Sequence, residues 1–160
     1  MRENHPYDEL VPGQSAELSR LCTVDDFFVF ANASGNRNPM HLPGADQDGD
    51  GIKDVAVAPA LWVASLISAV LDNVLPGAGT LYRAQTLEFL DRAHAGDTLI
   101  ARVTVREKRE GGIVVLDTEV LRAGDVCTIL RGRAEVIAPK VKLRHAEYEI
   151  PELTVARHAH

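Results

Sequence analysis

The spacing of apolar residues changes near residue 80. In 24–34 and 59–73, apolar side chains recur at helical spacing, which predicts two helices. From residue 81 onward apolar and polar residues alternate, which predicts half-buried strands. The alternating segments are 81–90, 97–109, 112–122 and 125–138, and glycine-containing turns separate them. With 15–22 as a first strand, this order predicts an α+β fold in which an antiparallel sheet wraps around the long second helix.

The two predicted helices have recognisable boundary residues. Thr23 is placed to cap the first helix, with Asp26 as its capping-box partner, and Gly35 suits a left-handed C-cap. Pro59 opens the second helix, since its missing N–H would be unpaired there in any case. Apolar groups cover most of the circumference of the second helix, so we expect burial on nearly every side.

Composition and charge restrict the classes of function. The chain has 160 residues, 46% apolar and 25% charged, as an ordinary soluble domain would. A net charge of −6 and a pI of about 5.5 argue against a general nucleic-acid binder, which normally carries a basic surplus. The longest apolar stretch, 55–75, is interrupted by Pro59 and Asp72, so it predicts a buried helix and no membrane span.

The N-terminus and the cysteines favour a cytoplasmic location. The opening sequence MRENHPYDEL lacks the apolar core of a secretion signal. Cys22 and Cys127 lie in neither a CxxC nor a metal-ligand spacing, so we expect both to be reduced core thiols. Residues 1–139 are predicted to form one domain, and residues 140–160, which lose the alternation, a C-terminal tail or linker.

The stretch ASGNRNPMHL, residues 33–42, is the first candidate for chemistry. It follows the first predicted helix and contains one histidine, His41, with Asn36 five residues earlier. A pair that activates water needs a proton acceptor and a partner at about this spacing, yet the amide of Asn36 cannot take a proton. These residues alone are compatible with two interpretations, an active site or a simple turn.

The acidic segment DQDGDGIKD is the second candidate. Asp46, Asp48, Asp50 and Asp54 stand at positions 1, 3, 5 and 9 of a calcium-loop pattern, with Gly51 at position 6 for the sharp turn. The bidentate glutamate expected at position 12 is absent. Two interpretations remain, a calcium site formed by these aspartates or a solvated acidic loop, and either is expected near the mouth of any cleft beside His41.

Four motifs in order carry a family resemblance. They are FANASGNRNPMHL, the helical ALWVASLISAVL, LPGAGTLYRAQTLEFL and AGDTLIARVTV. Together, over residues 8–138, they resemble the MaoC-like (R)-specific enoyl-CoA hydratase family of hot-dog proteins. More narrowly, the chain is similar to the hydratase-type N-terminal part of fusions with a phosphate acetyltransferase. The resemblance implies a hot-dog fold, reversible hydration of a trans-2-enoyl-CoA to an (R)-3-hydroxyacyl-CoA, no required cofactor, and a homodimer with acyl-CoA at its interface.

The resemblance also assigns roles to residues. His41 matches the family's histidine, and Asn36 stands where the family has the aspartate that shares a water with it. The backbone N–H of Ala60, at the start of the central helix, matches the donor that polarises the thioester oxygen, and Ser68 matches a serine near the pair. Because Asn36 can orient a water without accepting its proton, the resemblance implies either a weakened hydratase or an inactive site.

Two rival functions remain beside hydratase or dehydratase chemistry. One is a hot-dog module that binds acyl-CoA or a partner without catalysis. The other is a hot-dog thioesterase, which would want a carboxylate facing the thioester on the central helix, whereas Asp72 lies near the end of that helix.

Overall fold

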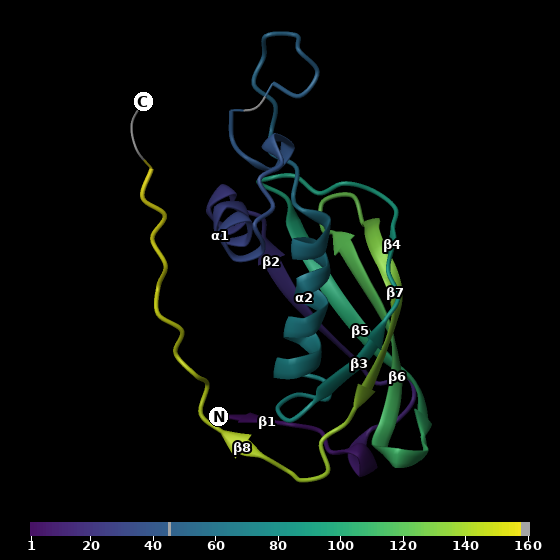
Figure 1. Ribbon diagram of the computed structural model, residues 1–160. Helices are drawn as coiled ribbons and strands as arrows, with labels where there is room; N and C mark the ends of the chain where they lie inside the picture. The colour runs from purple at the N-terminus through teal and green to yellow at the C-terminus, as the bar shows by residue number, and fades with distance from the viewer. Residues whose placement is uncertain (45, 158–160) are drawn as a thin grey trace.

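A computed structural model describes residues 1–44 and 46–157, and it places a curved six-stranded antiparallel sheet around one long helix, α2 (Figure 1). The strands lie in the order β2-β5-β6-β7-β3, and the short strand β4 also pairs with β7. The bounds are β2 Ser15–Leu21, β3 Leu81–Gln85, β4 Glu88–Phe89, β5 Thr98–Arg109, β6 Ile113–Arg122 and β7 Cys127–Ile137. The predicted α+β fold, with the sheet wrapped around the second helix, is confirmed.

Helix α2 spans Ala60–Asn73 and lies in the hollow of the sheet, in contact with β2, β5 and β6. Alternate residues of β5 point toward it and are buried, and each buried leucine or valine among them contributes about 1.5–3 kcal/mol. The buried residues of α2 are Trp62, Val63, Ile67, Val70 and Leu71. The opposite side of α2 is open, because Leu61, Ser65 and Asp72 are exposed. The expectation of burial on nearly every side is therefore wrong for a single chain.

Helix α1 spans Val24–Ser34 and is capped as predicted. The hydroxyl of Thr23 accepts the backbone N–H of Asp26 at 3.2 Å and donates to the Asp26 carboxylate at 2.7 Å. Gly35 ends the helix with φ at 77°, a left-handed conformation that glycine adopts without strain. These two boundaries set where the chain leaves α1 for the stretch that holds His41.

The single strand predicted over 81–90 is broken into β3 and β4. At the break, the backbone N–H of Thr86 donates to the carbonyl of Arg133, and the hydroxyl of Thr86 accepts the N–H of Arg133. The carbonyl oxygen of Thr86 lies so close to Gly132 that a Cβ there would be 1.8 Å from it. The break therefore depends on a glycine in the neighbouring strand, and the alternation within 81–90 gives no sign of it.

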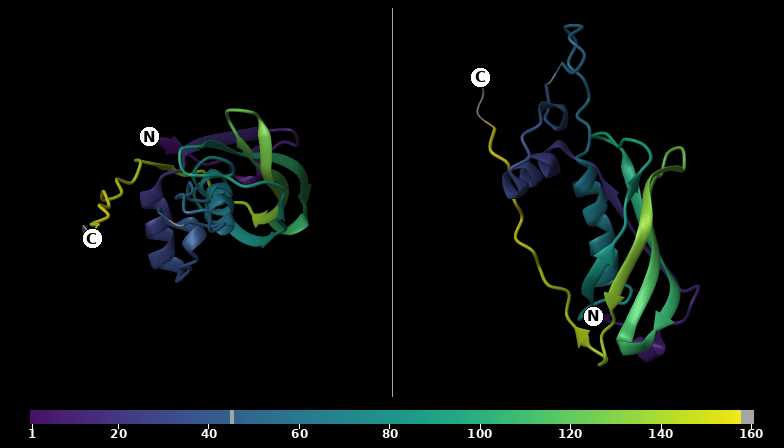
Figure 2. Two further views of the ribbon diagram at one scale, coloured as in Figure 1. Left: turned by 90° about the horizontal axis from the view of Figure 1, so that it is seen from above. Right: turned by 45° about the vertical axis from the view of Figure 1, so that its right-hand side comes forward.

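The two ends of the fold are tied together, which the sequence did not predict. Strand β1, Arg2–Glu3, pairs with β8, Arg144–His145. Asn4, which follows β1, is fully buried. Its side-chain amide donates hydrogen bonds to the backbone carbonyls of Ala78 and Val141 and accepts one from the backbone N–H of Leu143. Beyond β8 the chain runs extended as far as residue 157, and residues 158–160 of the predicted tail lie outside the described part (Figure 2).

Three short 3-10 helices complete the described chain, at Tyr7–Glu9, Pro39–His41 and Glu110–Gly112. Within the described residues, no helix combines the length and apolar content needed to cross a bilayer.

Candidate functional site

His41 lies at the end of the 3-10 turn Pro39–His41, and its ring is held by the backbone. Nδ1 is 2.8 Å from the carbonyl oxygen of Val57. A carbonyl only accepts hydrogen bonds, so Nδ1 carries the proton of the neutral ring and Nε2 keeps a free lone pair. The side chain is half-buried. The geometry therefore presents Nε2 of His41 as a proton acceptor.

Two asparagines shape the turn before His41. The side-chain oxygen of Asn36 accepts the backbone N–H of Asn38 at 3.1 Å, and that of Asn38 accepts the N–H of Met40 at 3.3 Å. Both bonds are of the Asx-turn type, which short polar side chains favour. Asn36 is exposed and uses its oxygen to hold the turn, so the group left to meet a water is its NH₂, a donor. Asn36 can therefore orient a water but cannot deprotonate it.

The turn is attached to the segment that leads into α2. The N–H of Val57 donates to the carbonyl of Met40 at 2.8 Å, and Val57 forms a β-bridge with His94. Two backbone hydrogen bonds flank this bridge, one from the N–H of Ala58 to the carbonyl of Ala93 and one from the N–H of Ala95 to the carbonyl of Ala56. The position of His41 is thus fixed to the main fold through residues 56–58.

The N-terminus of α2 follows three residues after Val57. Pro59 is the N-cap residue, and no side chain caps the helix there. The first N–H groups of an α-helix have no intrahelical acceptor, and the helix dipole makes this end positive. The N–H of Ala60 is among them, as predicted, and Ala60 is exposed. One short segment, 57–60, therefore links the carbonyl that holds His41 to a donor suited to a developing oxyanion.

Ser68 lies in the second half of α2. It lies eight residues after Ala60, roughly 12 Å along the helix axis. Its hydroxyl donates to the carbonyl of Ser65 at 2.7 Å. The catalytic role that the family resemblance implies for Ser68 stays a prediction. Trp62, by contrast, belongs to the core, where its ring meets that of Phe27 edge-on at 5.4 Å.

The acidic loop brings three of its four predicted aspartates together. Oxygen atoms of Asp46, Asp48 and Asp50 lie within 4.8 Å of one another, and all three residues are exposed. The Asp46 carboxylate accepts the backbone N–H groups of Gly51 and Gly49, both at 2.8 Å. These bonds, that from Gly51 first, lower the pKa of Asp46 and keep it ionised.

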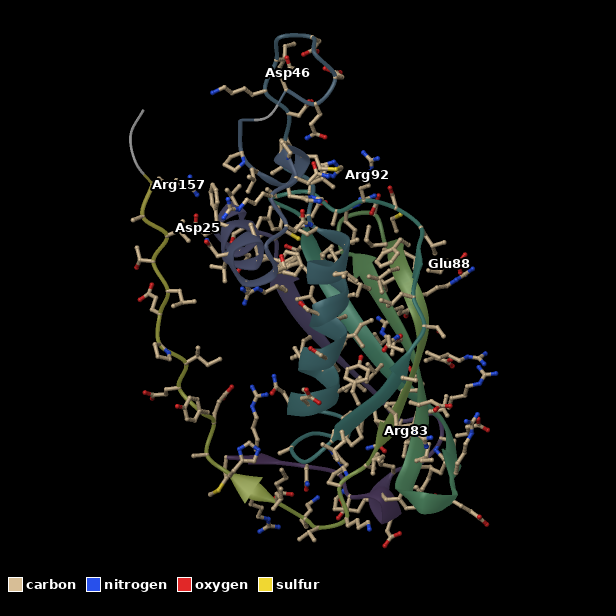
Figure 3. All side chains as sticks on the ribbon, in the orientation of Figure 1. Asp25, Asp46, Arg83, Glu88, Arg92 and Arg157 are labelled. Atoms are coloured by element: carbon tan, nitrogen blue, oxygen red, sulfur yellow. The ribbon has the colours of Figure 1, made fainter. Side chains whose placement is uncertain are left out.

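Asp54 lies apart from this cluster. Its carboxylate accepts the backbone N–H of Gln47 at 2.8 Å, which places it across the neck of the loop. Among the described residues, Asp54 is therefore not part of the three-aspartate cluster, and calcium binding by all four aspartates stays a prediction. Ala45, just before the aspartates, lies outside the described residues. Figure 3 shows Asp46 within the loop that projects beyond the end of the fold.

A hollow of about 650 Å³ separates the acidic loop from the His41 turn. Its lining comprises Asn38, Pro39, Met40, Asp46, Gln47, Asp48, Asp54 and Arg92. The acidic loop therefore faces the turn that leads to His41, and its place at the mouth of a substrate cleft stays a prediction. Arg92 was missed from the sequence, where its only signal was the polar pair Asp91-Arg92 that ends the alternation of 81–90.

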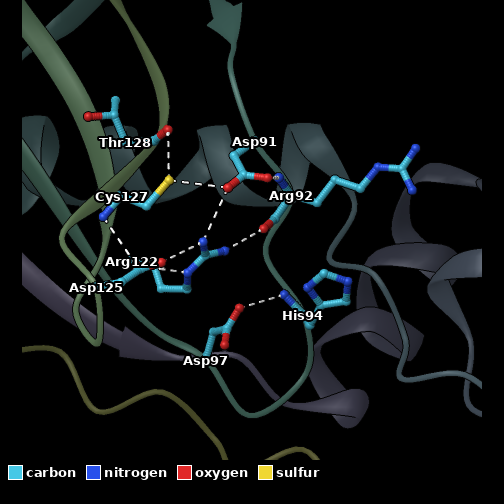
Figure 4. Close-up of polar contacts among 8 residues, drawn as sticks. All are labelled: Asp91, Arg92, His94, Asp97, Arg122, Asp125, Cys127 and Thr128. Carbon is cyan, nitrogen blue, oxygen red and sulfur yellow. Dashed lines mark hydrogen bonds and ion pairs between the residues drawn. The ribbon is translucent and has the colours of Figure 1, made fainter.

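A network of side chains fixes the backbone at Arg92 (Figure 4). Arg122 donates to the carbonyl of Arg92 at 2.8 Å and pairs with the carboxylates of Asp91 and Asp125. The thiol of Cys127 donates to Asp91 at 3.1 Å, and this bond raises the pKa of Cys127. The raised pKa disfavours the thiolate and so argues against a nucleophilic role.

The prediction of two core thiols holds for one cysteine. Cys22 is buried, and burial raises its pKa to about 12. Cys127 is only half-buried, at the start of β7, so the prediction is wrong there. Both are free thiols.

Comparison with known proteins places the chain in a family. No protein-family model matches it. An (R)-specific enoyl-CoA hydratase from Rhodospirillum rubrum is 34% identical over 139 residues, which cover 84% of this chain and 92% of that protein. The chain belongs to the MaoC-like (R)-specific enoyl-CoA hydratase family. A 3-hydroxybutyryl-CoA dehydratase from Methylorubrum extorquens is a further relative, 34% identical over 143 residues and matched over 84% of both chains.

Solved structures confirm the hot-dog fold of this hydratase-family chain. The unliganded R-hydratase PhaJ1 from Pseudomonas aeruginosa is 36% identical, with a TM-score of 0.89, and the match covers 96% of this chain and 98% of that one. The resemblance to the MaoC-like hydratase family, stated from the motifs around His41 and α2, is therefore confirmed, and the narrower similarity to fusions with a phosphate acetyltransferase stays a prediction.

Proposed function

We propose that this protein catalyses the reversible addition of water to a trans-2-enoyl-CoA, giving an (R)-3-hydroxyacyl-CoA. One observation carries the proposal. The Val57 carbonyl occupies Nδ1 of His41 and leaves Nε2 free to accept a proton, on a turn that matches the family motif. The relatives named for enoyl-CoA hydration and 3-hydroxybutyryl-CoA dehydration support the same reaction and the acyl-CoA substrate.

In the proposed reaction, Nε2 of His41 takes a proton from a water that the NH₂ of Asn36 orients. The water oxygen bonds to C3 of the enoyl group as the double bond opens, and electron density moves onto the thioester oxygen. The N–H of Ala60, at the positive end of α2, stabilises that oxygen. The enolate then collapses, C2 takes the proton held by His41, and the neutral imidazole is restored. No cofactor enters any of these steps.

Asn36 weakens the proposed base. General-base assistance contributes roughly 10²–10⁴ in rate, and here it rests on His41 without a carboxylate beside it. We therefore expect a hydratase slower than one with an aspartate at position 36. The same residue also favours the second candidate, a module that binds acyl-CoA without converting it.

The protein is proposed to act as a homodimer. Strand β3 and its continuation β4 form one edge of the sheet and expose apolar side chains, among them Leu81 and Phe89. The open side of α2 exposes Leu61 as well. Exposed sheet edges and apolar patches of this kind are usually covered by a partner. The cytoplasmic location expected from the sequence remains a prediction.

A two-signal assay tests the proposed reaction. Purified protein is mixed with crotonyl-CoA while loss of the enoyl absorbance and release of free thiol are followed together. Hydration removes the conjugated double bond and leaves the thioester intact, so absorbance falls without thiol. His41→Ala, measured alongside, should abolish the loss. Thiol release would instead identify a thioesterase, and binding of butyryl-CoA with neither signal would identify a non-catalytic module.

A further inference from the structure

Residues 56–58, which we call the strip, lie between two other segments and bond to both. On one side, backbone hydrogen bonds of 2.8 and 2.9 Å pair the strip with residues 93–95. On the other side, the Val57 carbonyl lies 2.8 Å from Nδ1 of His41. Successive carbonyls of an extended chain point in opposite directions. The pairing with 93–95 therefore directs the Val57 carbonyl toward His41.

The segment 91–97, which supplies the partner of the strip, lies between β4 and β5 and belongs to neither strand. Near its end, the carboxylate of Asp97 accepts the backbone N–H of His94 at 2.9 Å. Near its start, the guanidinium of Arg122, in β6, donates to the carbonyl of Arg92 at 2.8 Å. Backbone groups outside a strand ladder need such partners. Side chains therefore hold both ends of the segment.

Arg122 makes three polar contacts around the start of that segment (Figure 4). Besides the Arg92 carbonyl, it pairs with the carboxylates of Asp91 at 3.2 Å and Asp125 at 2.9 Å. Its side chain is 20% exposed, the lowest value among the arginines that form ion pairs in the described chain. A guanidinium presents several donors in a rigid planar fork, whereas a lysine ammonium is a compact point charge. The arrangement therefore requires an arginine.

We propose that Arg122 is a positioning residue for His41. Arg122 fixes the backbone at Arg92, and residues 93–95 then keep the strip in place. The strip in turn holds the Val57 carbonyl against Nδ1 of His41, which leaves Nε2 free to accept a proton. Arg122 acts without touching the substrate. The inference rests on the proposed function, because His41 is the base of that reaction.

Steady-state kinetics of Arg122→Ala test the role in the reaction. Loss of a support for the base raises the barrier to proton transfer and removes no contact with the substrate, so kcat should fall while KM stays unchanged. We expect kcat for crotonyl-CoA hydration to fall roughly tenfold to 100-fold, since a misplacement of about 1 Å can cost 10²-fold in rate. Arg122→Lys should recover only part of this loss, because the ammonium cannot reproduce all three contacts.

Arg106→Ala is the matched control. Arg106 pairs with Asp117 at 3.3 Å, so this variant also loses an arginine and an ion pair of the same sheet, outside the segment 91–97. It should keep the wild-type kcat and KM. Melting curves of each variant, recorded alongside, restrict the comparison to folded protein.

A spectroscopic measurement tests the positioning role independently of activity. NMR of isotope-labelled histidine distinguishes a neutral ring protonated at Nδ1 from one protonated at Nε2, and His41→Ala identifies the His41 signals among the six histidines of the chain. At alkaline pH, wild type and Arg106→Ala should both carry the proton of His41 on Nδ1. Arg122→Ala should shift these signals toward a mixture of the two tautomers, because the Val57 carbonyl is no longer held in place.

The outcomes separate this inference from the proposed reaction. A folded Arg122→Ala protein with the wild-type kcat and the wild-type tautomer overturns the inference, and so does an equal loss of kcat in Arg106→Ala. If Arg122→Ala does not fold, wild-type values of both in Arg122→Lys overturn it. If the wild type does not hydrate crotonyl-CoA, the proposed reaction fails, whereas a tautomer change confined to the Arg122 variants still supports the positioning of His41.

Discussion

At the scale of single residues, the site depends on a backbone carbonyl as much as on side chains. The Val57 carbonyl sets the tautomer of His41, and the Asn36 oxygen holds the turn that precedes it. Residue type and spacing identified His41 and Asn36 as candidates, and the family resemblance added the N–H of Ala60. They could not predict the role of the Val57 carbonyl. Every residue has a backbone carbonyl, and only the folded structure shows which one contacts His41.

The two cysteines provide a pH-dependent prediction at the same scale. A thiol-reactive dye should label native Cys127 and leave buried Cys22 unlabelled, and Cys127→Ser should remove the native reaction. Because the bond to Asp91 raises the pKa of Cys127, less thiolate is present near pH 8 than in a free cysteine, and labelling should speed up as pH rises.

Asp91→Asn removes the main cause of that raised pKa. The pKa of Cys127 should fall toward its ordinary value, so labelling at pH 8 should become faster, with Asp25→Asn, a distant surface change, as the control. Stopped-flow labelling rates check this, and a slower or unchanged rate in Asp91→Asn would count against the assigned hydrogen bond.

At the scale of elements, periodicity predicted the helices and most strands but not the break between β3 and β4. Alternation reports which face of a strand is buried and carries no information about another strand's backbone pressing against it. At the break, the carbonyl of Thr86 comes close to the backbone of Gly132. An isolated glycine in the predicted strand 125–138 was the available sign of such an approach.

Gly132→Ala should therefore destabilise the fold. The added methyl would meet backbone, which has little room to move, so we expect a loss of about 1–3 kcal/mol or more and a melting temperature lower by several degrees. Gly124→Ala is the matched control, since nothing lies within 4 Å of a Cβ there. Equal melting temperatures for the two variants would show that the backbone at Thr86 and Gly132 can move apart without loss of stability.

The acidic loop yields a prediction about calcium. If the clustered carboxylates of Asp46, Asp48 and Asp50 bind the ion, millimolar calcium should raise the melting temperature by mass action and give heat in a calorimetric titration. Asp48→Asn should weaken binding more than Asp54→Asn, because Asp54 lies outside the cluster. A titration without heat, together with an unchanged melting curve, would contradict calcium binding and support the interpretation as a solvated loop.

At the scale of the whole molecule, the single chain leaves apolar surface uncovered on α2, on the β3–β4 edge and on the tail. The central helix was expected to be buried on nearly every side, and one sheet covers only part of it. The pairing of β1 with β8 was also beyond prediction, since two-residue strands far apart in sequence show no periodicity.

The protein should therefore sediment at twice its 17.4 kDa chain mass, or at a multiple of that dimer. The proposed dimer would bury the β3–β4 edge, so charged substitutions at Leu81 and Phe89 should shift the equilibrium toward monomer. Analytical ultracentrifugation across a concentration series checks both statements. A folded 17.4 kDa monomer at all concentrations would contradict the proposed assembly.

The most direct test of the central claim is the rate of crotonyl-CoA hydration in Asn36→Asp, with and without His41→Ala. Asparagine and aspartate have nearly the same shape, so the turn should persist while the new carboxylate supplies the missing base. We predict a rate increase on the order of 10²-fold over wild type, and loss of nearly all activity in both backgrounds when His41 is replaced. If Asn36→Asp folds and binds butyryl-CoA but hydrates no faster, or if His41→Ala retains full activity, then the turn at Asn36–His41 is not a hydratase site.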